Sequence, residues 1–153
     1  MIIDTHAHLN FNAFKDDVDE VIRRSLDAGV WTINAGAKYE SSQRAVELAE
    51  KYQKGVFAAI GLHPIHATPD FKKSREEPSE GGPLASGEIF DKEKYKDLAK
   101  SKKVVAIGEI GLDYYYKPKT NVKIQDFKNK QKEIFVVQLN LAKELNLPVI
   151  IHC

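Results

Sequence analysis

Short hydrophobic runs alternate with amphipathic stretches along most of the chain. Five runs predict β-strands: IID (2–4), VWTINAG (30–36), GVFAAIG (55–61), KVVAIGEI (103–110) and the run that Pro148 opens. Apolar positions at helical spacing predict helices between them: from Asp16 to a stop at Gly29, from a cap at Ser41 or Ser42 to about Tyr52, near 91–100, and roughly 125–146. Strands that are apolar on both faces and alternate with helices are typical of a parallel sheet covered by helices.

Two α/β folds fit this alternation, an open doubly wound sheet and a (β/α)₈ TIM-type barrel. No G-x-G-x-x-G and no G-x-x-x-x-G-K-[ST] follows any predicted strand, which disfavours a nucleotide-binding open sheet. In both folds ligands bind at the carboxyl ends of the strands. We therefore look for chemistry at those ends.

One segment, at about 67–90, interrupts the alternation. It is rich in Pro, Gly, Ser and charged residues and has no apolar period, so it is interpreted as an inserted, flexible loop. The loop leaves the carboxyl end of the third strand and would overhang a site there. A solvated spacer explains it better than a substrate lid.

Composition narrows the class of protein. The 153 residues suit one domain, 1–153, and a net charge of +1 does not indicate bulk nucleic-acid binding. A single cysteine excludes an internal disulfide and fits a reducing compartment. The first residues are not a signal peptide, and no apolar run is long enough to span a membrane. We expect a soluble, cytoplasmic protein.

The titratable residues gather where predicted strands end. The five histidines lie at or just beyond strand exits: His6 and His8 after the first, His63 and His66 after the third, and His152 after the fifth. Glu109 and Asp113 follow the fourth strand. Because parallel strands meet at one edge, this placement predicts a shared site.

The motif DTHAH places His6 and His8 two residues apart on extended backbone, so that both side chains point to the same side. Two converging imidazoles are the start of a metal site, or else a hydrogen-bonded structural pair. Glu109 follows the apolar run VVAI, and its carboxylate can bridge two cations. These residues together favour a metal site.

The remaining candidates have weaker signals. Asp113 either orients a histidine ligand or caps the following turn. His63 is either a substrate or phosphate contact or a hydrogen-bonded structural histidine, and His66 is a loop residue. Gln131 and Gln138 share the apolar face of the last helix, where polar residues usually hold buried loops. Cys153 is interpreted as an inert core thiol.

The motifs DTHAHL, GLHP, GEIGLDYY, QKEIFVVQLNLAKELNLPV and IIH run in this order along the chain. Together they resemble the TatD family of metal-dependent deoxyribonucleases, whose fold is an amidohydrolase-like (β/α) barrel. The resemblance implies two divalent metal ions. Mg²⁺ is the expected metal, and Mn²⁺ and Zn²⁺ are the alternatives. It also implies hydrolysis of DNA phosphodiesters, typically from a 3′ end.

The resemblance also assigns roles to residues. His6 and His8 would hold one metal, Glu109 would bridge both as a catalytic residue, and His152 would hold the second. His63 and Asp113 would lie near the substrate. The DYYYKPK segment and the lysines after it are a candidate DNA surface, or else a solvated helix face.

The family barrel needs about 250 residues, so five strands make an incomplete barrel. The family's further histidine ligand and late aspartate match nothing here, and we expect PVIIHC to be a truncation. Open edges would favour self-association or a partner chain. Two alternatives remain: the same barrel acting on another ester or amide, such as an aminoacyl substrate, and a non-catalytic half-barrel.

Overall fold

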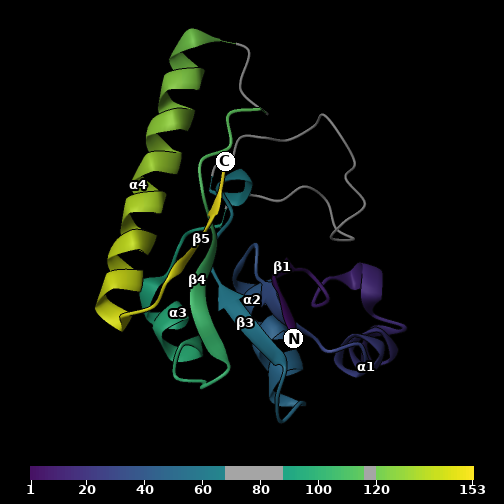
Figure 1. Cartoon of the computed structure of the whole chain (residues 1–153). Coiled ribbons are helices and arrows are strands. Elements are labelled where there is room, and N and C mark those ends of the chain that lie inside the picture. Colours follow the sequence, from purple (N-terminus) through teal and green to yellow (C-terminus); the bar gives the residue numbers. More distant parts are fainter. Residues whose placement is uncertain (68–87, 116–119) are drawn as a thin grey trace.

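A computed structural model describes residues 1–67, 88–115 and 120–153 (Figure 1). Its five strands are β1 (Ile2–Ala7), β2 (Val30–Ala35), β3 (Val56–Ile60), β4 (Val104–Gly111) and β5 (Val149–His152). They form one parallel sheet in the order β1-β2-β3-β4-β5. The described helices are α1 (Val18–Asp27), α2 (Tyr39–Glu50), α3 (Lys92–Leu98) and α4 (Asn121–Leu145), with short 3₁₀ turns η1 (Asn12–Phe14) and η2 (Pro64–His66). Consecutive parallel strands joined by helices confirm the expected TIM-type arc.

The main hydrophobic core lies between the sheet and the helices. It contains Ile60 and Ile107 from the strands and Ala49 and Leu141 from the helices, all buried. Figure 1 shows α4, the longest helix, running alongside β4. The other face of the sheet carries small side chains, with Ala35, Ala59 and Ala106 in a separate buried cluster. Small residues suit that face because the strands curve around it.

The ends of the helices test the predicted caps. Gly29, predicted to stop the first helix, has φ +73° just after α1. Asp91 caps α3 by accepting hydrogen bonds from the backbone N–H groups of Glu93 and Lys94. The cap predicted at Ser41 or Ser42 is wrong, because α2 already begins at Tyr39. Ser41 lies in the first turn and accepts from the backbone N–H groups of Ala37 and Lys38, whereas the Ser42 hydroxyl bonds to the backbone of Gly61.

Several predicted bounds shift for physical reasons. β1 continues to Ala7 and β4 to Gly111, so His6 and Glu109 lie inside strands rather than after them. Polar side chains do not end a strand whose ladder partners continue. α4 begins at Asn121 rather than near Gln125, because Val122 in its first turn is exposed and does not belong to the apolar face that predicted the helix.

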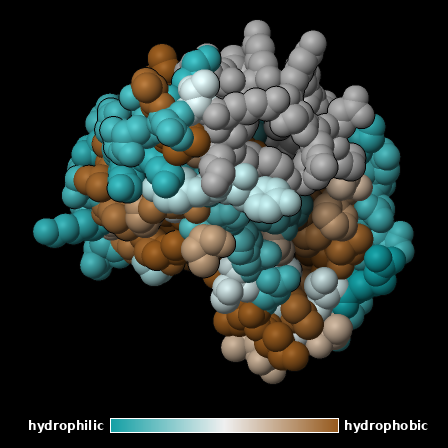
Figure 2. All heavy atoms as spheres, turned by 90° about the horizontal axis from the view of Figure 1, so that it is seen from above, coloured by the Kyte–Doolittle hydropathy of each residue, from teal (hydrophilic) through white to brown (hydrophobic). Residues whose placement is uncertain are grey.

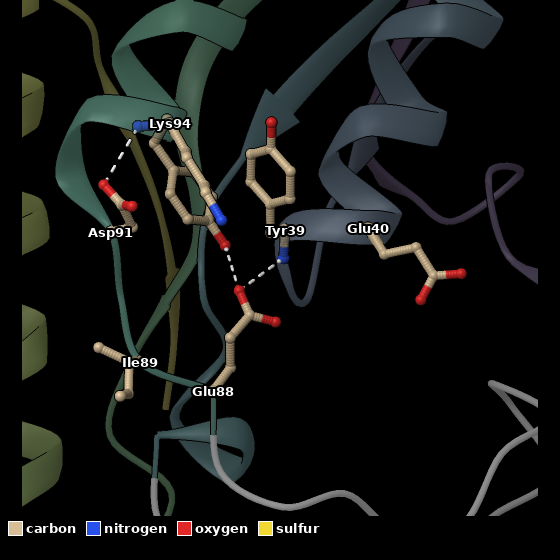
Figure 3. A pocket seen from close by; sticks show the side chains of 7 residues that line it. Tyr39, Glu40, Glu88, Ile89, Asp91 and Lys94 are labelled. Carbon is tan, nitrogen blue, oxygen red and sulfur yellow. Dashed lines mark hydrogen bonds between the residues drawn. The ribbon is translucent and has the colours of Figure 1, made fainter.

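The predicted insertion falls mostly on residues 68–87, which lie outside the described residues. Its two flanks are held together, since the backbone N–H of Glu88 donates to the carbonyl of His66 at 2.9 Å. The Glu88 carboxylate accepts from the backbone N–H of Tyr39 and from the hydroxyl of Tyr95, at 3.0 and 3.3 Å. Figure 3 shows these side chains around a pocket between the first turns of α2 and α3. The base of the insertion is therefore anchored beside α2.

The surface is mixed in character. Figure 2, a view from above, shows hydrophobic side chains gathered in patches among hydrophilic ones. No helix in the described parts of the chain combines the length and apolar character needed to cross a membrane. Large hydrophobic side chains are exposed on the two outer strands, including Ile2 at 67% and Ile151 at 55%.

Candidate metal centre

Four histidines surround one carboxylate at the carboxyl ends of the strands. Oε2 of Glu109 lies 3.0 Å from Nε2 of His6 and 3.8 Å from Nε2 of His8. Oε1 of Glu109 lies 2.6 Å from Nδ1 of His152 and 3.9 Å from Nε2 of His63. Glu109 itself is only 6% exposed. The two carboxylate oxygens thus face two different histidine groups, each spaced closely enough to hold a metal ion.

The ring of His8 is oriented by its neighbours. Its Nδ1 donates to the carbonyl of Ala35 at 3.0 Å, and a carbonyl can only accept. The proton therefore sits on Nδ1, and Nε2 presents a lone pair toward Glu109. Phe11 stacks on the ring at 4.4 Å, and the ring of His6 meets it edge-on at 5.0 Å. A histidine that binds a metal through Nε2 needs this tautomer, and the contacts of its other ring nitrogen fix the ring plane.

His63 has the opposite tautomer. Its Nδ1 accepts a hydrogen bond from the backbone N–H of Ile65 at 3.1 Å, so that nitrogen carries no proton. Burial lowers the pKa of His63 to about 4, against an opposing effect of Glu109, so the ring is neutral near pH 7. The remaining proton is on Nε2, which faces His152 at 3.1 Å. In this tautomer His63 is a hydrogen-bond donor, which leaves His152 and Glu109 as the candidate ligands of the second group.

Nδ1 of His152 is the meeting point of two contacts. It lies 3.1 Å from Nε2 of His63 and 2.6 Å from Oε1 of Glu109, and one ring nitrogen can satisfy only one of these two contacts. With the proton on His63, a lone pair of His152 would face a carboxylate oxygen at hydrogen-bond distance. A positive species, a proton or a metal cation, must occupy this gap to make the contact favourable.

The protonation of Glu109 agrees with this arrangement. Burial acts to raise the pKa of its carboxyl, but His63, His152 and His6 together outweigh burial and the pKa is lowered. The carboxylate is therefore ionised at neutral pH, as a metal ligand must be.

The donor set fits divalent cations. Around a metal bound at about 2.0–2.2 Å, adjacent N and O ligands lie roughly 3.0–3.4 Å apart. The separations of Glu109 from His6 and His8 bracket that range, whereas the 2.6 Å contact with His152 would have to open slightly. Imidazole and carboxylate ligands suit Zn²⁺ or Mn²⁺, and Mg²⁺ prefers oxygen.

Two glutamines from α4 hold the loops that carry the site. Gln138 bonds both the N–H and the carbonyl of Leu62, at 2.7 and 3.0 Å, directly before His63. Gln131 accepts from the N–H of Asp113 and donates to the carbonyls of Asp113 and Pro64. The expectation that these residues hold buried loops is confirmed.

Of the two roles left open for Asp113, the structure shows the turn cap. Its Oδ1 accepts from the backbone N–H of Tyr115 at 2.9 Å and so caps the turn after β4. Its Oδ2 lies 3.9 Å from Nε2 of His152, on the side of the ring away from Glu109. Asp113 can therefore orient His152, but a direct hydrogen bond is not formed at this distance.

Other candidates lie outside the cluster. His66 belongs to η2 rather than to a loop, and burial lowers its pKa to about 4. Cys153 is exposed, so its interpretation as a core thiol is wrong. Gly111 is a position that sequence reasoning missed: a Cβ there would lie 2.1 Å from the carbonyl of His152, at φ +152°. Only glycine lets β4 approach β5 this closely beside the ligand.

The fold and the cluster together define a parallel (β/α) barrel protein with a histidine and carboxylate centre. The chain belongs to the TatD-related DNase family, whose model matches residues 3–153. It is 39% identical over 99% of its length to the uncharacterized metal-dependent hydrolase YabD of Bacillus subtilis, covering 50% of that protein. It is 32% identical over 99% of its length to the 3′-5′ ssDNA/RNA exonuclease TatD of Shigella flexneri, covering 49% of it.

A solved structure agrees with the fold. The crystal structure of YjjV, a TatD homologue from Escherichia coli K12, superposes with a TM-score of 0.69 at 32% identity, covering 99% of this chain and 50% of the other. The chain therefore spans about half the length of the relatives it matches. The activities of these longer proteins are therefore only proposed for this chain.

Proposed function

We propose that the protein is a metal-dependent hydrolase that cleaves DNA phosphodiesters, removing nucleotides from a 3′ end. One observation carries the proposal. At the carboxyl ends of the strands, the two carboxylate oxygens of Glu109 each face a separate histidine group. A carboxylate in this position can hold two cations. The family and the exonuclease name of the Shigella relative support DNA as the substrate class.

The protonation state of each histidine decides whether it would bind a metal or donate a hydrogen bond. His6, His8 and one oxygen of Glu109 would hold one cation, and His152 and the other oxygen would hold the second. Bound divalent metals activate a water and stabilise the oxygens of an in-line displacement at phosphorus. His63 would donate its Nε2 proton to a phosphate oxygen, because Ile65 holds the other ring nitrogen as an acceptor. Asp113 would orient His152.

The segment after β4 supports nucleic acid as the partner. Tyr115 is 77% exposed, and its backbone N–H is held by Asp113 close to the cluster. An exposed aromatic ring beside a phosphate site can stack on a nucleobase. Lys128 lies over the ring of Tyr114 at 4.9 Å, which adds positive charge to the same surface. We propose Mg²⁺ as the metal in the cell and a cytoplasmic location, the latter supported by the single cysteine.

The test is hydrolysis of a 3′-labelled single-stranded oligonucleotide with Mg²⁺ or Mn²⁺. We expect loss of label that stops with a chelator, and a His6→Ala variant at least about 100-fold slower, since it removes a ligand rather than an outer partner. His66→Ala is the matched control, because His66 is a histidine of the same loops with no contact to Glu109. Turnover of an aminoacyl ester with no cleavage of DNA would contradict the proposal.

We propose in addition that the outer strands are covered by a second copy of the chain. Ile2 and Ile3 on β1 and Ile151 on β5 expose apolar surface next to unpaired strand edges, which favour pairing with another chain. Native mass spectrometry is expected to show a dimer, twice the 17.2 kDa of one chain. An Ile151→Lys variant should shift this population to monomer. A wild-type monomer at micromolar concentration would contradict self-association.

A further inference from the structure

Asn10 lies two residues after His8 and is almost fully buried, at 6% exposure. Its Nδ2 donates two hydrogen bonds, to the carbonyl of Ala35 at 3.1 Å and to the carbonyl of Ser41 at 2.9 Å. Both partners are acceptors, so the amide orientation is unambiguous. The side chain therefore links the loop after β1 to the end of β2 and to the first turn of α2.

The carbonyl of Ala35 is shared. It accepts from Asn10 and also from Nδ1 of His8, at 3.0 Å. The same bond sets the tautomer of His8 and turns its Nε2 lone pair toward Glu109. A side chain that fixes the carbonyl of Ala35 therefore also fixes the imidazole of His8.

The backbone between His8 and Asn10 is held by side chains rather than by the sheet. The last paired residues of the β1–β2 ladder are Ala7 and Asn34. Beyond them, the N–H of Leu9 donates to Oδ1 of Asn34 at 3.1 Å, and Nε of Arg44 donates to the carbonyl of Asn10 at 3.0 Å. Without these contacts the segment after His8 would be free to move.

Oδ1 of Asn10 is buried and has no hydrogen-bond partner among the residues that the structure describes. An unpaired buried oxygen is unfavourable, and an apolar side chain would avoid it. Filling the space therefore does not explain asparagine here. Two N–H donors aimed at two carbonyls do explain it.

We infer that Asn10 is a positioning residue that fixes the carbonyl of Ala35 and thereby holds His8 as a metal ligand. This inference rests on the proposed metal site. Replacing Asn10 with aspartate keeps the shape, removes both N–H donors and turns one carboxylate oxygen toward the two carbonyls. We expect Mn²⁺ affinity to fall about 10–100-fold, as for other partners of metal-binding histidines. Asn10→Ala, which adds no charge, should shift affinity in the same direction.

Asn12→Asp is the matched control, because it makes the same change at an exposed position of the same loop. Calorimetric titration with Mn²⁺ measures affinity, and ¹⁵N NMR of the metal-free protein reports the tautomer of His8. We expect the Nδ1–H form to predominate in wild type and Asn12→Asp, and to lose its predominance in both Asn10 variants. A lower melting temperature with tautomer and Mn²⁺ affinity unchanged would make Asn10 merely structural and overturn the inference. If wild type bound no Mn²⁺, the proposed function would fail, and the tautomer alone would decide the role of Asn10.

Discussion

A Glu109→Gln variant is expected to lose divalent metal binding by more than about 100-fold and to show no cleavage of DNA. Changes to partners outside the ligand shell cost up to about 100-fold in affinity, and a bridging ligand must cost more. Glutamine keeps the shape of Glu109 but offers one neutral oxygen in place of two charged ones. Both histidine groups would lose their common anionic ligand. Calorimetric titration with Mn²⁺ measures the loss.

The same variant is expected to lower the stability of the metal-free protein at neutral pH. The lowered pKa of Glu109 means that its contacts with the histidines outweigh the cost of burying the carboxylate, and glutamine loses the charge on which these contacts depend. A glutamine amide replaces them only with neutral hydrogen bonds. Glu88→Gln is the matched control, because Glu88 is also hydrogen-bonded but lies away from the cluster. Unchanged Mn²⁺ binding in Glu109→Gln would rule out Glu109 as a ligand.

A Gln138→Leu variant is expected to unfold far more easily than wild type. Leucine fills the space but leaves the N–H and carbonyl of Leu62 buried without partners. Each unsatisfied group costs about 1–3 kcal/mol, so we expect a loss of roughly 2–6 kcal/mol in the free energy of unfolding. Urea denaturation followed by circular dichroism measures this change.

Gln125→Leu is the control on the same helix, since Gln125 is exposed and, within the part of the chain that the structure describes, its side chain bonds to Asn129 one turn away. A surface substitution of this kind should stay within about 0.5 kcal/mol of wild type. If Gln138→Leu were equally mild, the contact with Leu62 would not hold the loop, and His63 would owe its position to other residues.

The sequence by itself determined the class of fold and the place of the site. Apolar runs of strand length separated by helical periods indicate a parallel α/β sheet, because each pattern depends only on residues near in the chain. The histidines follow those runs, and parallel strands bring their carboxyl ends to one edge. The sequence therefore predicts that His6, His8, Glu109 and His152 lie together, as they do. Gln131 and Gln138 were correctly interpreted as loop supports, because polar residues on the apolar face of a helix usually bond to buried loops.

Only the tertiary structure decided what each ring nitrogen does. His63 and His8 look alike in the sequence, yet one accepts from Ile65 and the other donates to Ala35, and these bonds give opposite tautomers. The roles of Asn10 and Gly111 were equally invisible, because their partners lie on strands and turns distant in the chain. Hydrogen-bond direction depends on atoms that folding brings within about 3 Å. Local patterns predict which residues meet at an edge of the sheet, but not how their donors and acceptors pair there.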